Sequence, residues 1–455
     1  MTRYQLDVST RTVGDGSVVL GGSPLRLFRL TPAGRDLYDR IAAGDDVERS
    51  ELVTRMVGGG AIHPLVSRDG PHRFGPADVT VVVPTHETPV AVADELVHSC
   101  RGVAGVVFVD DGSSERLTGV RGSSVVRLAH NRGPGPARNT GAMSVTTPLI
   151  AFVDSDVEAH SGWLDLLIAH FDDEAVGFVA PRVRSGPALP GGDERVAHYE
   201  SSHSPLDLGP HPARVVPRTR VAYVPTAAIV VRRDAYTGVG GFDPDLRYGE
   251  DVDLVWRLVR AGFQGRYEPG VVIEHAPRRT WRRLGAHRHT YGTSAAALAE
   301  RHGALVAPVR VSPWSAVVWG LVATGHPVVA AGVAAATAGA LVRKLRGVPA
   351  ALSARLTIRG HVAAGQATFS AMRRAWWPIM VVGTIWSRRV RVLSAVAAAA
   401  ALADGGPARV FDDGAYGLGV WKGVMKTRRL TALRPEFVGW PPPAESNSVA
   451  DGTVA

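Results

Sequence analysis

The chain of 455 residues is poor in several residue types, and each shortage excludes a class of protein. Cys100 is the only cysteine, so no intrachain disulfide can form and a reducing cytosol is expected. The first ten residues contain no apolar run, so we expect no secretory signal peptide there. Disorder is excluded as well, because hydrophobic residues make up 45% of a chain long enough for two or three domains.

Acidic residues are absent from one long stretch, between Glu300 and Asp404. Residues 276–434 carry 23 Lys and Arg against 4 Asp and Glu, a local charge of +19, and the rest of the chain sums to −10. A basic segment of this size predicts an anionic partner such as a lipid surface, a nucleic acid or a phosphorylated substrate. We expect no nucleic acid, because the segment lacks regularly interleaved aromatic residues and any recognisable binding motif.

Residues 1–75 are predicted to form a small module of their own. Short apolar runs in the first 30 residues indicate strands, and Thr31-Pro32 is typical of a helix start. A second helical pattern covers residues 52–57. Strands followed by two short helices predict a winged-helix-like fold. The module has no cluster of catalytic residue types, so it is either a binding module or a structural appendage.

Residues 76–310 alternate between strand and helix patterns. Helical patterns separate the strands, with one helix expected from about Ala137. The alternation predicts an α/β domain with a doubly wound sheet, in which ligands bind beyond the carboxyl ends of the strands. Each predicted strand ends in polar or charged residues; the strands are 79–83, 103–109, 125–128 and 149–153.

Residues 311–434 are predicted to be a basic, helical, membrane-associated region. Residues 314–342 hold no charge, and a second apolar run, Trp376–Trp386, has an arginine pair on each side. If both runs crossed a membrane, the loop between them would place seven positive charges outside, which favours a re-entrant or surface-lying hairpin. An Ala-rich soluble helical bundle is the alternative. Residues 435–455 are expected to form a disordered tail.

Carboxylates follow two of the predicted strands. Asp154 and Asp156 come directly after the last of the four, and two oxygen ligands at the mouth of a sheet suit Mg²⁺ or Mn²⁺. Asp110 and Asp111 follow the second strand, where a carboxylate can accept hydrogen bonds from a nucleobase or a ribose. The alternative for either pair is an ordinary turn, in which Asp, Gly and Ser are common.

A loop rich in glycine and proline, residues 131–141, is similar to the G-x-G-x-x-G motif, but Arg138 stands where the third glycine should be. The broken motif excludes an NAD-linked oxidoreductase. The loop leads into a helix whose amino end can receive a phosphate group, with Arg138 as its charge partner. A plain glycine turn is the alternative.

Glu250 and Asp251 are expected in the first turn of a helix, where the helix dipole favours acids. A carboxylate at that position can also reach an acceptor hydroxyl and deprotonate it as a general base. His275 closes another predicted strand and is either a metal ligand or a structural histidine.

Five motifs occur in order, and together they resemble the family 2 glycosyltransferases of GT-A fold: VVPT at 82–85, VDDGS at 109–113, NRG and ARNTGA within 131–142, FVDSD at 152–156 and GEDVDL at 249–254. The resemblance covers about residues 78–290. It implies a GT-A mixed sheet and inverting transfer from a nucleoside diphosphate sugar, with Asp251 as the base and Glu250 beside it. It assigns the donor nucleotide to Thr85, Glu87, Asp110, Asp111, Arg138 and Asp154, and the metal, Mg²⁺ or Mn²⁺, to Asp154, Asp156 and His275.

The order of the parts, together with DDGAYGLGVWKG at 412–423, resembles the mycofactocin-system glycosyltransferases of actinobacteria. That resemblance implies β-1,4-linked glucose, with UDP-glucose as donor, on a peptide-derived redox cofactor or its precursor. The reducing compartment and the basic, apolar C-terminal region predict a location at the cytoplasmic face of the membrane. Residues 1–75 also look like modules that bind precursor peptides. A cell-wall rhamnosyl- or galactofuranosyltransferase is the alternative within this class. A non-catalytic scaffold that binds peptide and lipid is the alternative from another class, and the intact acids at 154, 156 and 251 disfavour it.

Overall fold

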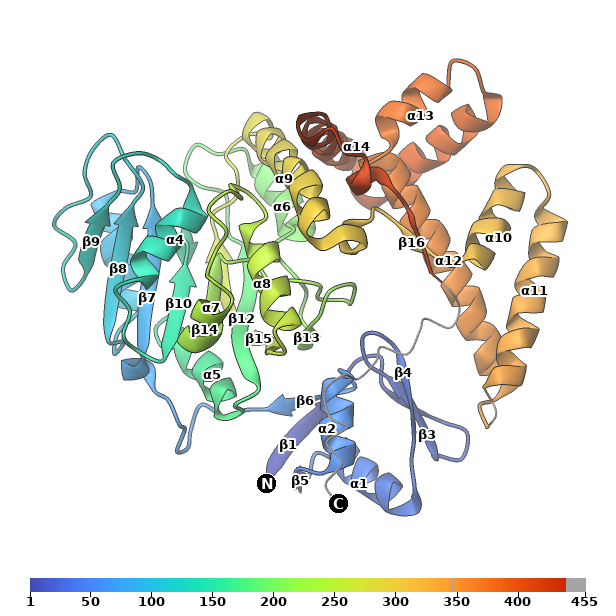
Figure 1. Ribbon diagram of the computed structural model, residues 1–455, viewed down its shortest axis with the longest axis horizontal. Coiled ribbons are helices and arrows are strands. Elements are labelled where there is room, and N and C mark those ends of the chain that lie inside the picture. The colour runs from blue at the N-terminus through green and yellow to red at the C-terminus, as the bar shows by residue number, and fades with distance from the viewer. Residues whose placement is uncertain (346, 439–455) are drawn as a thin grey trace. The chain divides into compact units, whose positions relative to one another are not determined.

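The computed structural model of the chain describes residues 1–345 and 347–438 (Figure 1). It divides into two compact units, residues 1–287 and residues 288–455. The first unit holds the predicted N-terminal module and most of the predicted α/β domain. The tail predicted at 435–455 lies outside the described residues from 439 onward, and before that point Glu436 and Phe437 form a strand.

The N-terminal module consists of two three-stranded sheets, ordered β5-β1-β6 and β2-β3-β4, and two helices. Both helices begin where the sequence predicts, because Thr31 and Ser50 cap them by accepting from backbone N–H groups. These elements agree with the strands and the two short helices that the sequence predicts for residues 1–75. The elements of the module are β1 (Thr2–Leu6), β2 (Arg11–Val13), β3 (Val18–Gly21), β4 (Arg26–Arg29), α1 (Pro32–Ala43), β5 (Asp46–Val47), α2 (Glu51–Gly58) and β6 (Ile62–Leu65).

A buried carboxylate ties this module to the remainder of the first unit. Asp7 follows β1, and its Oδ2 accepts from Nη2 of Arg220 at 2.8 Å and lies 2.9 Å from Nε2 of His63 in β6. Close by, Arg214 donates to the backbone carbonyl of Gly58. Breaking a buried charge pair by removing one partner is strongly destabilising, so these contacts fix the module to the segment 214–220, which carries both arginines.

A nine-stranded mixed sheet is the centre of the α/β domain (Figure 1). Its order is β11-β15-β12-β14-β10-β7-β8-β9, with β13 beside β15. Strands β10, β7, β8 and β9 are parallel, and β14 runs antiparallel to both β10 and β12. The strands are β7 (Val79–Thr85), β8 (Gly105–Asp110), β9 (Ser124–Arg127), β10 (Leu149–Val153), β11 (Val157–Glu158), β12 (Val176–Ser185), β13 (Ala213–Val215), β14 (Ala228–Arg232) and β15 (Gln264–His275).

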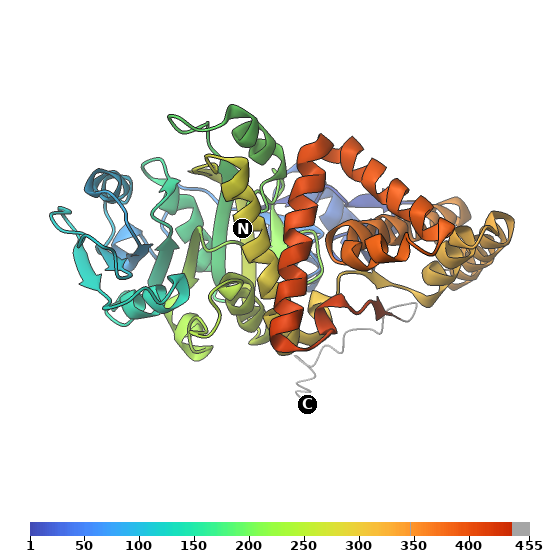
Figure 2. The same ribbon diagram turned by 90° about the horizontal axis from the view of Figure 1, so that it is seen from above.

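Helices cover both faces of the sheet, which confirms the doubly wound prediction (Figure 2). All four predicted strands are present, and the helix expected from Ala137 begins earlier, at Pro134, because proline is well suited to the first helical position. The helices are α3 (Val90–Ser99), α4 (Pro134–Ala142), α5 (Trp163–Ala169), α6 (Glu194–His203), α7 (Arg233–Gly238), α8 (Glu250–Arg260) and α9 (Trp281–His302), with helical turns η1 (Pro76–Asp78) and η2 (His170–Asp172).

The period-two alternation of the strands builds a separate core on each face of the sheet. On one face α3 and α5 pack against the alternate residues of β7 and β10. On the other face α4 approaches β7 closely through Gly141, where a Cβ atom would lie 2.5 Å from Cγ1 of Val82. Beside it the ring of Phe152 contacts Tyr236 and Phe242, at centroid distances of 5.1 and 5.2 Å. These aromatic residues support the helices that carry the candidate site.

Among its described residues, the second unit is helical apart from a two-stranded sheet of β16 (Arg310–Val311) and β17 (Glu436–Phe437). The uncharged run at 314–342 forms two helices, because Gly325 has a φ of 86° and Pro327 starts a new helix. The predicted run Trp376–Trp386 contains only a seven-residue helix. The helices are α10 (Pro313–Ala323), α11 (Pro327–Lys344), α12 (Ala350–Arg374), α13 (Trp377–Gly383) and α14 (Arg388–Thr427), with turns η3 (Gly303–Val306) and η4 (Thr431–Leu433).

Helix α14 has two parts that behave differently. Gly405 and Gly406 leave helical geometry just before Pro407, so the helix kinks there. The part after the kink packs on α9 without space for side chains, since a Cβ atom at Gly419 would lie 1.9 Å from the carbonyl oxygen of His289. The part before the kink makes no such contact among the described residues.

Two residues at the start of the apolar run Trp376–Trp386, the first tryptophan and a flanking arginine, pack within the helical bundle. The indole N–H of Trp376 donates to the carbonyl of Leu433 at 2.9 Å. Arg373 pairs with Asp404 and Asp413, each at 3.2 Å. The sequence pattern was misleading here because an arginine paired inside a bundle and an arginine facing lipid look the same in a hydropathy profile.

Candidate active site

Three neighbouring parallel strands bring predicted site residues to one edge of the sheet. Strand β7 ends at Thr85, β8 ends at Asp110, and Asp154 comes directly after β10. Because β7 lies between β8 and β10, their carboxyl ends form one continuous edge. Doubly wound folds bind ligands at this edge, as the sequence predicts for this chain.

Arg138 of α4 joins the two halves of the candidate site. Its side chain is buried; Nη1 donates to Oε1 of Glu250 at 3.0 Å, and Nη2 donates to Oδ1 of Asp154 at 2.5 Å. The ring centroid of Phe242 lies 5.3 Å from the guanidinium carbon. The Nε–H group is buried and meets no acceptor among the described residues. The guanidinium group of Arg138 therefore connects the carboxyl edge of the sheet with helix α8, and its Nε–H group remains able to donate a further hydrogen bond.

Helix α8 presents the two predicted catalytic carboxylates. It begins after Gly249, whose φ of 78° is a conformation that glycine adopts without strain. Glu250 is buried against Arg138, whereas Asp251 is half-buried and accepts only a short backbone hydrogen bond, from Val252 at 2.8 Å, among the described contacts. Asp251 is therefore the carboxylate of the pair that has room to bind a substrate hydroxyl.

Burial raises the pKa of three carboxyl groups in this cluster. It raises the pKa of Glu250 to about 7, and the neighbouring charge of Asp251 adds to the effect while Arg138 opposes it. Burial also raises the pKa of Asp251 and of Asp154, again against the charge of Arg138. Carboxyl groups that exchange protons closer to neutral pH than usual are suited to general acid–base chemistry.

Asp156 and His275 form a second cluster at the same edge. Nε2 of His275, at the end of β15, lies 3.2 Å from Oδ2 of Asp156, and Nη1 of Arg278 lies 3.9 Å from the same oxygen. Burial alone would raise the pKa of Asp156, but the hydrogen bond and the charge of His275 outweigh it and hold that pKa at about 2. Burial would lower the pKa of His275, and its pairing with Asp156 raises it.

The two aspartates after β8 hold loops in place. Asp110 is fully buried and accepts from the backbone N–H of Ser113 and from Nη1 of Arg127, both at 2.9 Å. The carboxylate of Asp111 accepts from the N–H groups of Arg132 and Gly133, at 2.7 and 2.8 Å. Asp110 and Asp111 thus position the loops that surround the predicted nucleoside site, and a direct contact between Asp110 and a nucleoside would require its buried oxygens to change partners.

Glu87 lies on the loop after β7 in a backbone conformation unusual for its residue type, with a φ of 54°. Its carboxylate accepts from the N–H and the hydroxyl of Ser114, at 2.7 and 2.9 Å, and its own N–H donates to Oγ of Ser113. Thr85 is buried at the start of the same loop. These contacts bring Thr85 and Glu87 beside the loop after β8, and backbone strain of this kind is frequent at functional sites.

Two residues of the site were missed by sequence reasoning. Glu200 of α6 is buried, and its Oε2 accepts from the backbone N–H of Arg278 at 2.6 Å, which fixes the turn that follows His275. A signal for Glu200 was available, since it is a carboxylate on the apolar face of a short helix. Arg278 gave no signal, because it stands in the arginine-rich segment 278–283 where no single arginine is distinguished.

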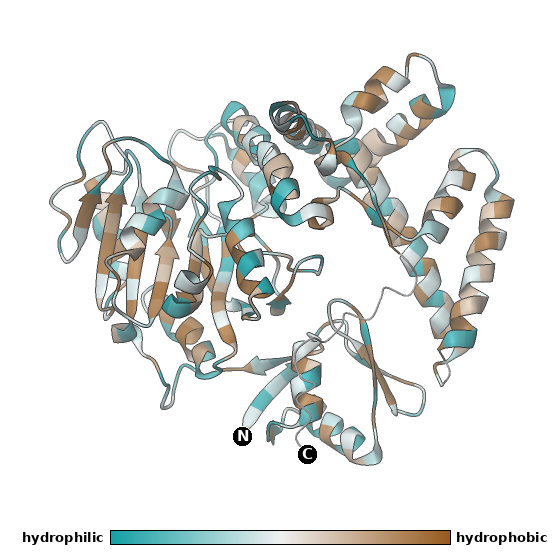
Figure 3. Ribbon diagram, viewed as in Figure 1, coloured by the Kyte–Doolittle hydropathy of each residue, from teal (hydrophilic) through white to brown (hydrophobic). Residues whose placement is uncertain are grey.

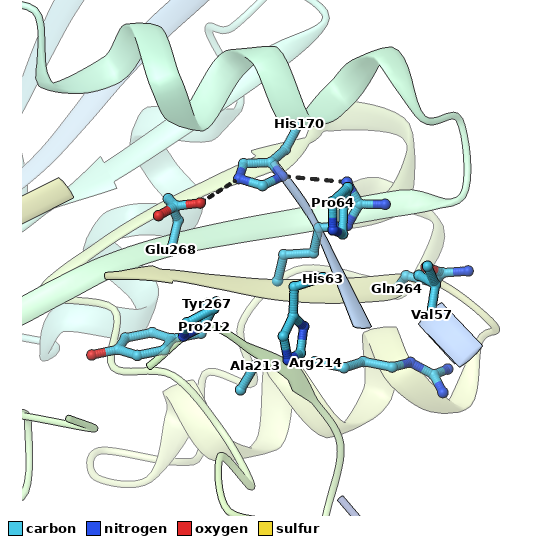
Figure 4. A pocket seen from close by; sticks show the side chains of 11 residues that line it. Val57, His63, Pro64, His170, Pro212, Ala213, Arg214, Gln264, Tyr267 and Glu268 are labelled. Atoms are coloured by element: carbon cyan, nitrogen blue, oxygen red, sulfur yellow. Dashed lines mark hydrogen bonds and ion pairs between the residues drawn. The ribbon is translucent and has the colours of Figure 1, made fainter. Parts of the chain in front are cut away.

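A groove and a small cavity lie elsewhere, where the N-terminal module meets the sheet. The groove measures about 690 Å³ and is lined mainly by β1, α2, β6 and η2. The cavity measures about 20 Å³, enough for one water molecule. Figure 4 shows how His170 beside this cavity is held by Glu268 at 2.9 Å. None of the predicted site residues lines the groove or the cavity. The candidate active site is therefore described by the contacts of its charged side chains.

Comparison with known proteins gives a consistent family. The profile described as "Glycosyl transferase family 2" matches residues 80–236. Pre-mycofactocin glycosyltransferase of Mycobacterium tuberculosis is 39% identical over 469 aligned residues, which cover 95% of this chain and 97% of that protein. N-acetylglucosaminyl-diphospho-decaprenol L-rhamnosyltransferase of the same organism is 34% identical over 169 residues, covering 35% of this chain and 54% of that protein.

Among solved structures, the chain is similar to a mannosyltransferase, PcManGT from Pyrobaculum calidifontis, in complex with GDP-mannose and Mn²⁺. The sequence identity is 18%, the TM-score is 0.42, and the match covers 78% of this chain and 91% of that chain. A TM-score of this size is a weak structural likeness.

Proposed function

Because this chain belongs to glycosyl transferase family 2, we propose that it transfers a sugar, with inversion at the anomeric carbon, from a nucleoside diphosphate sugar to a hydroxyl group of a pre-mycofactocin-type acceptor. The donor in this proposal is UDP-glucose, and the linkage formed is β-1,4. The acceptor follows from the relative that is 39% identical over nearly the whole of both chains.

One observation carries the chemical part of the proposal. Arg138 bonds at the same time to Asp154, which follows the central strand edge, and to Glu250, which starts α8 next to Asp251. The proposed donor site at Asp154 and the start of the helix that carries the proposed base, Asp251, therefore contact the same buried cation, Arg138. The arrangement suits a single displacement, in which the acceptor is deprotonated on one side of the anomeric carbon while the diphosphate leaves from the other.

The donor contacts in this proposal come from the loops at the strand ends. Thr85, Glu87 and the loops held by Asp110 and Asp111 surround the nucleoside, and the free Nε–H of Arg138 donates to an oxygen of the ribose or the diphosphate. Arg278, beside Asp156, is a second cation within reach of the diphosphate. Charge-assisted hydrogen bonds of this type are among the stronger polar contacts in proteins.

The residues present fit a divalent cation bound mainly by its substrate. An oxygen of Asp156 and a nitrogen of His275 lie 3.2 Å apart, close enough for both to coordinate one ion. The described residues contain no group of three or more such side chains placed for one ion, and the carboxylate of Asp154 is turned to Arg138. Mg²⁺ or Mn²⁺ would thus be held by Asp156 and His275, with Asp154 joining if it left Arg138, and would neutralise the leaving diphosphate.

In the proposed step, Asp251 takes the proton from the acceptor hydroxyl while the new glycosidic bond forms and the bond to the diphosphate breaks. Its raised pKa makes it a stronger base than an ordinary aspartate while it is ionised. Glu250 holds Arg138 in place and keeps a negative charge beside Asp251. A single displacement needs one base, unlike glycoside hydrolysis, which uses two carboxyl groups flanking the bond.

A donor and acceptor screen tests this function. Purified protein is incubated with UDP-glucose, dTDP-rhamnose or UDP-galactofuranose, pre-mycofactocin and Mn²⁺, and products are identified by mass spectrometry. We expect a mass gain of one or more hexose units from UDP-glucose alone. Transfer from dTDP-rhamnose to a lipid-linked acceptor would favour the alternative function, a rhamnosyltransferase like the relative described above. Absence of transfer from every donor would contradict the proposal.

Activity should depend on pH through the raised carboxyl groups. As pH falls through about 7, Glu250 takes up a proton and weakens its ion pair with Arg138, and burial raises the pKa of Asp251 as well. The rate therefore rises with pH along an acid limb near neutrality. We expect Glu250→Gln to make this limb less steep, because only Asp251 then titrates. A rate that is constant between pH 5 and 9 would contradict the assignment.

Removal of divalent metal should abolish transfer. We expect EDTA to stop the reaction and Mn²⁺ or Mg²⁺ to restore it, with Asp156→Asn needing at least about tenfold more metal for half-maximal rate because a charged ligand is lost. Asp39→Asn, on the exposed surface of α1, is the matched control and should titrate like the wild type. Full activity in EDTA would exclude the metal site.

A further inference from the structure

Exposed large hydrophobic side chains are concentrated in one part of the second unit. Of the 29 such side chains among the described residues, 15 lie between residues 314 and 402, in the stretch that lacks any acid. Scattered exposed apolar residues are normal on a soluble protein, but a contiguous set marks an interaction surface. Figure 3 shows the same helices, α10, α11 and α13, with long hydrophobic stretches.

Two helical hairpins carry most of these side chains. Hairpin 1 consists of α10 and α11, residues 313–344, and hairpin 2 consists of α13 and the part of α14 before its kink, residues 377–404. On hairpin 1 the exposed apolar side chains are Trp314, Val317, Val322, Val328 and Val329. On hairpin 2 they are Ile379, Val381, Val382, Ile385, Trp386, Val392, Val396 and Leu402.

Cations dominate the charge around these side chains. Arg343 and Lys344 are exposed at the end of hairpin 1, and Arg388, Arg389 and Arg391 are exposed next to Trp386 on hairpin 2. The one acid of the two hairpins, Asp404 at the end of hairpin 2, is paired with Arg373 and Arg409. An apolar surface bordered mainly by cations complements an anionic phospholipid bilayer, because arginine and tryptophan side chains favour the headgroup region. A surface for another protein would be expected to pair some of these cations with acids.

Helix lengths decide how deep the hairpins can enter. Helices Pro327–Lys344 and Arg388–Thr427 are long and apolar enough to cross a membrane, and only 17% and 11% of their most apolar windows are buried. However, the kink at Gly405 and Gly406 leaves 17 residues of α14 before it, and α10 has only 11 residues, about 16 Å. The hydrocarbon core is about 30 Å thick, so neither hairpin can cross it twice.

From these observations we propose that the two hairpins form a monotopic membrane surface, which enters one leaflet of an anionic bilayer without spanning it. Hairpin 1 inserts its uncharged tip, and hairpin 2 lies at the headgroup level with Trp386 and its arginines. The second part of α14, packed on α9 through Gly419, stays outside the lipid and connects the membrane surface to the rest of the unit.

Flotation of the full chain with liposomes tests this proposal. We expect binding to vesicles of phosphatidylcholine with 30% phosphatidylglycerol and weak binding to pure phosphatidylcholine. The double variants Ile385→Glu with Trp386→Glu, and Val328→Glu with Val329→Glu, should each lower the partition coefficient by roughly a hundredfold, because each loses the burial of two apolar side chains. Arg388→Glu with Arg389→Glu should lower it by on the order of tenfold on the anionic vesicles only.

Controls separate this surface from general stickiness. Leu25→Glu and Met143→Glu replace exposed apolar residues of the first unit and should leave lipid binding unchanged. All the altered side chains are at least partly exposed, and donor-nucleotide binding checks that each variant is folded. Equal binding by the hairpin variants and the wild type would overturn the proposal. So would a wild type that ignores vesicles but forms a dimer that the same substitutions dissociate, since the surface would then join two copies. Protease would also be added to sealed vesicles that carry the protein. If it cleaved neither face of the hairpins, that result would contradict one-leaflet insertion.

Discussion

Asp251→Asn is expected to lower kcat for sugar transfer by about 10² to 10⁴, the usual contribution of a general base. The asparagine keeps the shape of the side chain and its backbone hydrogen bond with Val252, but it cannot take a proton. Donor binding should stay within about twofold of the wild type, because in the proposed step this carboxylate contacts the acceptor and not the donor. Steady-state kinetics and calorimetric titration with UDP measure the two quantities separately.

The neighbouring carboxylate provides the matched comparison. Glu250→Gln removes the charge that pairs with Arg138 but leaves Asp251 in place, so we expect a smaller loss of kcat and a weaker affinity for the donor. If Asp251→Asn turned over at a near-normal rate and Glu250→Gln were inactive, the two roles would have to be exchanged. That result would be compatible with transfer itself and would change only the residue that acts as base.

Arg138→Ala is expected to lower the free energy of unfolding by about 3–5 kcal/mol at pH 8, because it removes the buried cation that both Asp154 and Glu250 contact. Urea unfolding monitored by circular dichroism measures the change. The exposed Arg116→Ala should shift the free energy of unfolding by no more than about 0.5 kcal/mol.

The stability loss in Arg138→Ala should depend on pH in a definite direction. Without the guanidinium group, the pKa values of Glu250 and Asp154, already raised by burial, rise further. A carboxyl group whose pKa is higher in the folded protein than in the unfolded chain destabilises the fold at high pH, and this penalty disappears as the group is protonated. The loss should therefore be smaller at pH 5.5 than at pH 8. An equal loss at both values would mean that the two carboxylates are not confined together.

Much of the catalytic edge could be predicted from the sequence because local patterns determine it. The apolar runs before Asp110 and Asp154 fix two strands, and parallel strands place their carboxyl ends together whatever the rest of the fold does. Glu250 and Asp251 follow Gly249, and the sequence placed them correctly at a helix start. The contact between Arg138 and Glu250, which are 112 positions apart, could not be derived in this way, since no local pattern encodes a long-range pair.

The C-terminal region was the least predictable from its sequence. Residues 314–342 and Trp376–Trp386 were recognised as apolar, but the first run divides into two helices around Gly325 and the second contains only the short helix Trp377–Gly383. Hydropathy also gave equal weight to Trp376, which bonds inside the bundle, and to Trp386, which is 77% exposed. Only packing in three dimensions separates the residues that hold the bundle together from those left for a partner.

The double pairing of Arg138 has a consequence for the order in which substrates bind. When a nucleoside diphosphate sugar bonds to Asp154 or to Arg138, the charge that remains to balance Glu250 changes, and with it the proton affinity of Asp251. In the proposed function, the first substrate would therefore change the proton affinity of the base that acts on the second. We therefore expect kinetics in which the donor binds before the acceptor, because the proton affinity of Asp251 reaches its working value only when the donor is bound.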